Sequence, residues 1–164
     1  LCDAYVNVIR GIPVVVLLLI FFFIIMKTSD NGVLVAILTF GINSGAYMAE
    51  LVRGGIGAVD HGQTEAGRSL GMSKIQTMTR IIIPQAVRHI LPAMGNEFIA
   101  LLKETSVAGY VAVQDLTKGG DIIRSRTYSP FLPLLAVAAI YLALVMFFSW
   151  LVSKLERRLR NSEH

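Results

Sequence analysis

The chain has 164 residues, of which 54% are hydrophobic and only 16% are charged, with a net charge of +4. Ordinary soluble domains carry about 25% charged residues, so this composition argues against a soluble domain, and its apolar content argues against intrinsic disorder. The single cysteine, Cys2, excludes an internal disulfide and a zinc cluster built on paired cysteines, so a membrane protein is the expectation that remains.

The first two of four apolar stretches predict membrane-spanning helices of different quality. Residues 12–26 are too few to cross a bilayer, which needs about 20 helical residues, and Pro13 interrupts them. We therefore expect this span to borrow from residues 4–10 through a helix that is kinked or restarted at Pro13. Residues 33–52 are long enough by themselves, although they carry polar side chains at Asn43, Ser44 and Glu50.

The third and fourth stretches differ in polarity. Residues 90–113 are too polar to face lipid on all sides, because they include Asn96, Glu97, Lys103 and Glu104. Residues 131–152 contain no charge, and Trp150 lies near the end that precedes Lys154. The expected fold class is all-α: a polytopic membrane helix bundle of about four spans, with a cytoplasmic helix pair between the second and third.

The distribution of basic residues predicts the orientation of the chain. Ten of the 15 Lys and Arg residues lie in the head, in the segment 53–89 or after the fourth span, and only four lie in the other connecting segments. Because positively charged segments stay cytoplasmic, we place the segment 53–89 and the C-terminus in the cytoplasm. Nucleic-acid binding is the alternative use of such charge, but these residues form no continuous stripe.

The segment 53–89 carries signals for two short helices. The first is expected to begin near Gln63 or Thr64 and to end at Gly71, since glycine accepts the left-handed conformation that follows a helix. This start would put Glu65 in the first turn, where the helix dipole favours a carboxylate.

The second short helix is expected to start after Ser73. Ser73 and Gln76 have the spacing of a capping box, and the helix should run to about Ile83, where Pro84 breaks or kinks it. Apolar residues would then form a stripe suited to a groove on a partner, at Ala66, Leu70, Met72, Ile75 and Met78. Packing of the segment on its own membrane domain is an equally open alternative, whereas base-reading side chains for a DNA-binding helix-turn-helix are missing.

The same segment matches a fixed-spacing motif: Glu-Ala-Ala, three residues, Gly, nine residues, Ile-x-Leu-Pro. The residues at those places are Glu65, Ala66, Gly67, Gly71, Ile81, Ile83 and Pro84. Gly67 replaces the second Ala and Ile83 replaces Leu. The segment resembles the EAA loop of ABC importer permeases. Stretches at residues 10–13, 46–56, 102–106 and 114–117 are similar to the polar amino-acid subfamily of these permeases.

This resemblance covers essentially the whole chain and implies its domain organisation. We expect a single ABC importer transmembrane domain over residues 1–164, with the cytoplasmic EAA coupling loop at residues 60–86. Members of the subfamily carry one more membrane helix before the stretch that begins at Arg10, so we expect this chain to be N-terminally truncated.

The resemblance also implies a function and partners. The chain would be a permease subunit in the inner membrane, forming the path for a polar amino acid. It would work with a separate ABC ATPase, an extracytoplasmic amino-acid-binding protein and a second permease copy or sister permease. ATP would be used by the ATPase, and this chain would bind no cofactor and catalyse no reaction. The residues expected to dock the ATPase are Glu65, Ala66, Gly67, Gly71, Ser73, Ile81, Ile83 and Pro84. An ion-gradient-driven transporter or channel, and a membrane subunit with no path, are the alternatives.

The substrate path is expected on the polar spans. Glu97 and Glu104 are seven residues apart and share one helix face, with Asn96 and Lys103 on the neighbouring face. Lys103 and Glu104 could instead form an ion pair at the membrane surface.

Asn43 and Ser44 of the second span are candidates for the path or for hydrogen bonds between helices. The histidines are too scattered for a metal site, at His61, His89 and His164.

Overall fold

The computed structural model describes residues 2–160, and every regular element in that range is helical. Leu1 and His164, the two ends of the predicted domain, lie outside the described residues. In chain order the elements are α1 (Cys2–Gly11), α2 (Val14–Ile20), η1 (Phe21–Ile25), α3 (Gly32–Gly57), α4 (His61–Ser69), α5 (Lys74–Thr77), η2 (Met78–Ile82), α6 (Ile83–Glu104), η3 (Thr105–Val111), α7 (Leu116–Thr127) and α8 (Phe131–Arg160). The all-α prediction is therefore confirmed.

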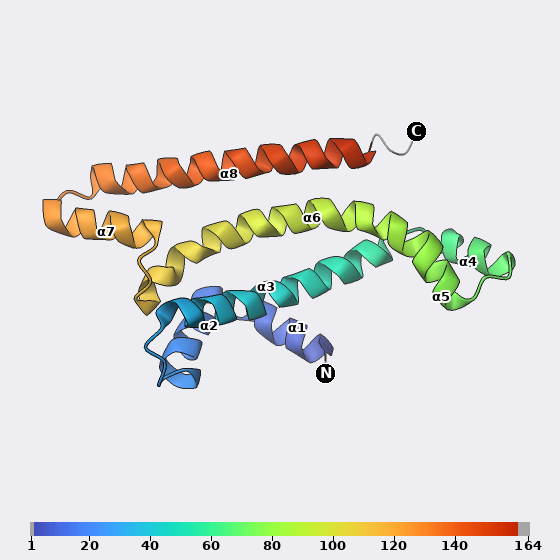
Figure 1. Cartoon of the computed structure of the whole chain (residues 1–164), viewed down its shortest axis with the longest axis horizontal. Coiled ribbons are helices and arrows are strands. Elements are labelled where there is room, and N and C mark those ends of the chain that lie inside the picture. The colour runs from blue at the N-terminus through green and yellow to red at the C-terminus, as the bar shows by residue number, and fades with distance from the viewer. Residues whose placement is uncertain (1, 161–164) are drawn as a thin grey trace.

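Three long helices form the body of the molecule. Helix α6 lies between α3 and α8 and packs on both of them (Figure 1). Helices α4 and α5 extend beyond one end of this body, and η3 and α7 lie at the other end. The C-terminal end of α8 points to the same end as α4 and α5 (Figure 1).

Two helices in the described range are long and apolar enough to cross a membrane individually, α3 and α8. The first predicted span is helical on both sides of Pro13, but the two parts are bent by 104°. The bend has a local cause, because Pro13 has no N–H to donate to a continuing helix. Helices α1 and α2 with η1 therefore count as one broken span at most. Helix α6 has the length of a span but is more polar.

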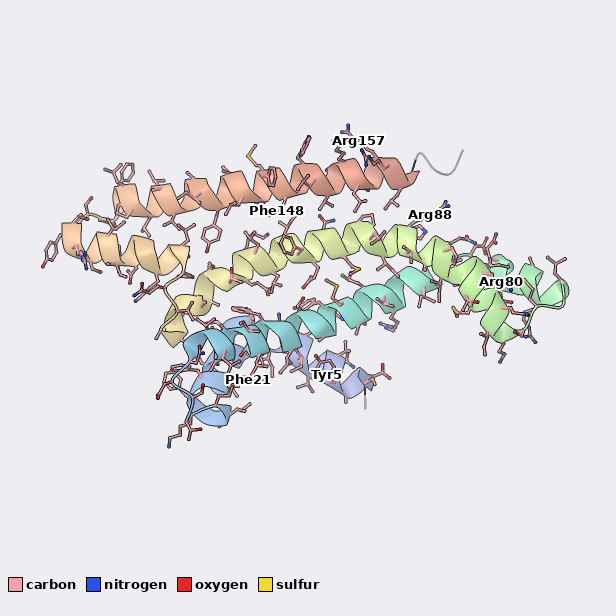
Figure 2. All side chains as sticks on the ribbon, viewed as in Figure 1. Tyr5, Phe21, Arg80, Arg88, Phe148 and Arg157 are labelled. Carbon is pink, nitrogen blue, oxygen red and sulfur yellow. The ribbon has the colours of Figure 1, made fainter. Side chains whose placement is uncertain are left out.

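Glycines set the close approach of the long helices. A Cβ on Gly55 of α3 would lie 2.2 Å from Cγ1 of Ile90, and a Cβ on Gly95 of α6 would lie 2.7 Å from Cγ2 of Val152. Small residues at such contacts let helix backbones come close together, which strengthens packing where lipid supplies no hydrophobic drive. Phe98 and Phe148 add an edge-to-face ring contact between α6 and α8, with 5.1 Å between centroids. Phe148 is labelled in Figure 2.

The buried apolar residues form two clusters at opposite ends of α3. One cluster joins α2, the start of α3 and η3, with Leu18, Phe40 and Val111 among its members. The other joins the residues just after α3 to η2 and the start of α6, through Val59, Ile82, Ala86 and Ile90. The second cluster anchors the base of the α4–α5 unit on the membrane helices.

Candidate functional site

Helix α4 begins earlier than its sequence predicts. Asp60 is the N-cap, and its carboxylate accepts a hydrogen bond from the Gly62 N–H at 2.9 Å. The predicted start at Gln63 or Thr64 is therefore wrong, because Asp60 supplies an earlier cap. Glu65 consequently lies in the second turn, so its predicted first-turn position is wrong too. Its exposed side chain is free to meet a partner.

The turn after α4 has the predicted geometry. Gly71 has φ of +79°. The Gly71 N–H donates to the Arg68 carbonyl at 3.0 Å and the Met72 N–H donates to the Gly67 carbonyl at 3.1 Å. These two bonds make a Schellman motif, whose left-handed residue favours glycine. The prediction for Gly71 is confirmed.

The next helix starts with the predicted capping box. The Ser73 hydroxyl accepts from the Gln76 N–H at 3.2 Å, and the Gln76 side-chain oxygen accepts from the Ser73 N–H at 2.9 Å. Both backbone groups are satisfied reciprocally, which fixes where α5 begins.

Of the two outcomes expected at Pro84, a break or a kink, the break is wrong because the chain stays helical through Ile83. Helix α5 passes through the π-helical turn η2 directly into α6, with Pro84 in the first turn of α6. Because the chain is helical before Pro84 as well as after it, the π-turn is the feature that accommodates the ring, since it widens the backbone. The side chain of Gln85 donates to the Ile81 carbonyl at 3.1 Å and to the Gln63 side chain at 3.3 Å, which ties α6 to α4.

Gly67 allows the two short helices to pack. It is buried, and a Cβ there would lie 2.9 Å from Cγ2 of Thr77 and 3.0 Å from Cδ1 of Ile81. The second Ala of the motif would collide in this chain, so glycine at this position has a packing reason. Of the predicted docking residues, Gly67 and Ile81 are therefore internal to the segment, whereas Ala66, Ser73, Ile83 and Pro84 are exposed.

The far tip of this unit is apolar and unpacked. Leu70 is 81% exposed, Ile75 is 75% exposed and Met78 is 40% exposed. Exposed basic residues lie within two positions of them in the sequence, at Arg68, Lys74 and Arg80, and Figure 2 shows Arg80 in this unit. We call Leu70, Ile75 and Met78 the docking tip. The alternative for this segment was packing on its own membrane domain. Such packing is found around the buried Ile82, away from the docking tip.

Between α3 and α6 the structure brings two predicted polar residues together. The Asn43 amide, only 2% exposed, donates to the Glu104 carboxylate at 3.3 Å. Glu97 is half-buried two turns away on the same face of α6, while Asn96 and Lys103 are exposed. Asn43 is therefore a hydrogen-bond partner between helices. Within residues 2–160, no ion pair joins Lys103 to Glu104.

A second polar cluster, between α1 and α3, went unrecognised in the sequence. Glu50 accepts from Arg53 one turn along α3 and pairs with Arg10 of α1 at 3.5 Å. The Arg10 guanidinium also lies 5.2 Å from the ring centroid of Tyr47, and the Tyr5 hydroxyl donates to the Ile42 carbonyl at 2.7 Å. These contacts hold α1 against α3, on the N-terminal side of the bend at Pro13. A carboxylate in an apolar span was the signal that could have prompted a search for its partner.

At the opposite end, α7 carries an acidic and basic network. Asp115 caps the helix by accepting from the Lys118 N–H at 2.7 Å. Asp121 accepts from Arg124 and pairs with Lys118 at 3.4 Å, and the hydrogen bond from Arg124 lowers the pKa of the Asp121 carboxyl. A cavity of about 370 Å³ opens beside them, lined on its other sides by Ser106, Gly109, Tyr110, Thr117 and Leu134. Gly120 packs on α8, because a Cβ there would lie 2.5 Å from Cγ2 of Val137.

Comparison with known proteins gives a consistent result. Residues 1–161 match the family described as "Binding-protein-dependent transport system inner membrane component". The glutamine transport system permease protein of Escherichia coli strain K12 is 36% identical over 160 residues, which cover 95% of this chain and 73% of that protein. A crystal structure of an amino acid ABC transporter with histidines matches with a TM-score of 0.91 and 46% identity, over 95% of this chain and 74% of that chain. The inward-facing MetNI methionine ABC transporter shares the fold, with a TM-score of 0.79 and 22% identity over 96% of this chain and 73% of that chain.

Proposed function

The chain belongs to the family of inner-membrane components of binding-protein-dependent transport systems, as a permease subunit of an ABC importer, and we propose that its cargo is a polar amino acid. The glutamine permease and the amino acid transporter among its relatives support this substrate class. So do the acidic and amide side chains on the facing sides of α3 and α6, which offer partners to an ammonium and a carboxylate.

The observation that carries the coupling role is the docking tip. Leu70 and Ile75 stand exposed on helices fixed by a Schellman motif and a capping box. A rigid unit can transmit the closing movement of an ATPase to the membrane helices, whereas a flexible loop would absorb it. Because α5 continues through η2 into α6, a displacement of the tip is delivered to the helix that carries Glu97 and Glu104. The partner is a separate ABC ATPase, and ATP is bound there rather than by this chain.

The translocation path is proposed to run along the polar face of α6. Glu97 and Glu104 line it and Asn43 orients the Glu104 carboxylate, while Asn96 and Lys103 are positioned to meet the substrate at the exposed side of the helix. An extracytoplasmic binding protein delivers the amino acid, and a second permease copy or sister permease completes the path. The protein resides in the inner membrane, with α4, α5 and the C-terminus on the cytoplasmic side, in keeping with its basic residues.

Reconstitution tests this function. The permease, its ATPase and its binding protein are placed in vesicles, and uptake of labelled glutamine is measured with ATP or with a non-hydrolysable analogue on the ATPase side. We expect uptake only with ATP. Uptake that continues with the analogue and follows an imposed ion gradient would instead favour a secondary transporter.

A further inference from the structure

One face of α8 carries an aromatic ring and two cations around a hollow. Trp150, Ser153, Lys154 and Arg157 line a cavity of about 320 Å³. Their spacing of three and four residues puts all four on one side of the helix. The Lys154 ammonium lies 5.1 Å from the centroid of the Trp150 ring, which is itself 58% exposed. We call these four residues the α8 basic face.

The cations of the α8 basic face have no carboxylate partner in the part of the chain that the structure describes. Neither Lys154 nor Arg157 takes part in an ion pair there. Glu156 is the neighbouring acid on α8, and at 100° per residue it projects to a different side of the helix from either cation. Within residues 2–159, therefore, no carboxylate competes with an anion for the positive charge of the face.

The α8 basic face also lies at a defined depth. Lys154 is the first charged residue of α8 after the apolar run that qualifies the helix to cross a membrane, and Trp150 precedes it by one turn. Tryptophan concentrates where hydrocarbon meets headgroups. Helix α6 packs against α8 at this depth, where Gly95 lies against Val152. Arg88 of α6 lies two turns beyond Gly95, toward the end of the molecule where Figure 2 places Arg157.

We propose that the α8 basic face binds the headgroup of an anionic phospholipid, with the phosphodiester at Lys154 and Arg157. Phosphate oxygens make strong charge-assisted hydrogen bonds with such side chains, and basic residues next to a membrane helix attract anionic lipids. Exposed apolar side chains lie one turn before Trp150 on α8, toward the middle of the membrane, at Met146 and Phe147. These side chains would meet the acyl chains of the lipid. A free phosphate would use the two cations but leave this apolar surface and the Trp150 ring without a role, so the lipid is the better match.

Trp150 makes the site directly observable, because it is the only tryptophan among the 164 residues. The permease is reconstituted into phosphatidylcholine vesicles that contain increasing fractions of chain-brominated phosphatidylglycerol, and quenching of Trp150 fluorescence gives the relative binding constant at this site. Each basic side chain at a membrane surface favours an anionic lipid by about fivefold, so we expect a preference of about fivefold to twenty-fivefold over phosphatidylcholine.

Three variants separate the site from general charge effects. K154Q/R157Q should lower the preference to unity, whereas R157K, which keeps both cations, should retain it. The matched control is K27Q/R126Q, which removes the same charge from the opposite end of the molecule and should leave the preference unchanged. Equal circular dichroism spectra establish that the variants are folded.

Several results would overturn the proposal. One is equal quenching by brominated phosphatidylglycerol and brominated phosphatidylcholine in the unaltered permease. Another is a preference that survives in K154Q/R157Q. A preference that inorganic phosphate abolishes, while chloride at equal ionic strength does not, would assign the face to free phosphate instead of a lipid.

Discussion

Replacing Leu70 and Ile75 by alanine tests the docking tip without disturbing the fold. The two side chains are 81% and 75% exposed, so truncation should change the free energy of unfolding by no more than about 0.5 kcal/mol. Their effect should be confined to the complex with the ATPase, where the tip is expected to be buried.

The size of the effect follows from the apolar groups removed. Each substitution deletes three carbon atoms, and burial is worth about 0.8 kcal/mol per methylene. With about three quarters of each side chain available for burial, L70A/I75A should lose about 3 to 4 kcal/mol of binding free energy, or about a few hundredfold in the dissociation constant.

The assay is binding of the ATPase to the permease in nanodiscs, followed by ATP-driven uptake in vesicles. We expect both to fail together in L70A/I75A. The matched control is I123A, which truncates a side chain that is 53% exposed on α7, at the opposite end of the molecule, and should bind the ATPase normally. If L70A/I75A binds the ATPase with unchanged affinity, the docking tip is not the coupling surface and the reasoning above fails.

Three further predictions address the packing and the polar pairs. G67A should destabilise the α4–α5 unit by about 1 to 3 kcal/mol through overpacking, which limited proteolysis of the segment would detect. The second variant, G67A/T77S, removes the Thr77 methyl group that the new Cβ would strike and should restore much of the resistance to the protease. A double-mutant cycle of N43A and E104Q, measured by thermal unfolding in detergent, should give a coupling free energy of about 0.6 to 1.7 kcal/mol. A coupling of zero would mean that the hydrogen bond from Asn43 to Glu104 does not stabilise the protein. The hydrogen bond from Arg124 lowers the pKa of Asp121, so the ion pair on α7 contributes its full stability above the ordinary carboxyl range and is lost only as pH falls through the lowered value. NMR of a labelled Asp121 carboxyl should therefore give a titration midpoint below the ordinary aspartate value of about 3.9. In R124Q the midpoint should rise, and an unchanged midpoint would contradict the pairing.

The α4–α5 unit shows which parts of the site could be predicted from the sequence. The left-handed turn at Gly71 and the capping box of Ser73 and Gln76 each depend on residues within five positions of one another, so spacing and residue type are sufficient. The start of α4 was placed two or three residues late because Asp60 competes as a cap, and a local pattern cannot rank the two starts. The sequence predicts a break or a kink at Pro84, because the π-turn that accommodates this proline has no sequence signature.

By itself the sequence determined the class of this protein: an apolar chain with ten of its 15 basic residues in three segments and a motif of fixed spacing in one of them. Only the tertiary structure decided which polar residues meet. Asn43 and Glu104 are 61 positions apart, and Arg10 reaches Glu50 from another helix. The 104° bend at Pro13 and the close contact of Gly55 with Ile90 bring these residues together, since helix periodicity gives the face of a side chain but not the helix that will lie opposite it.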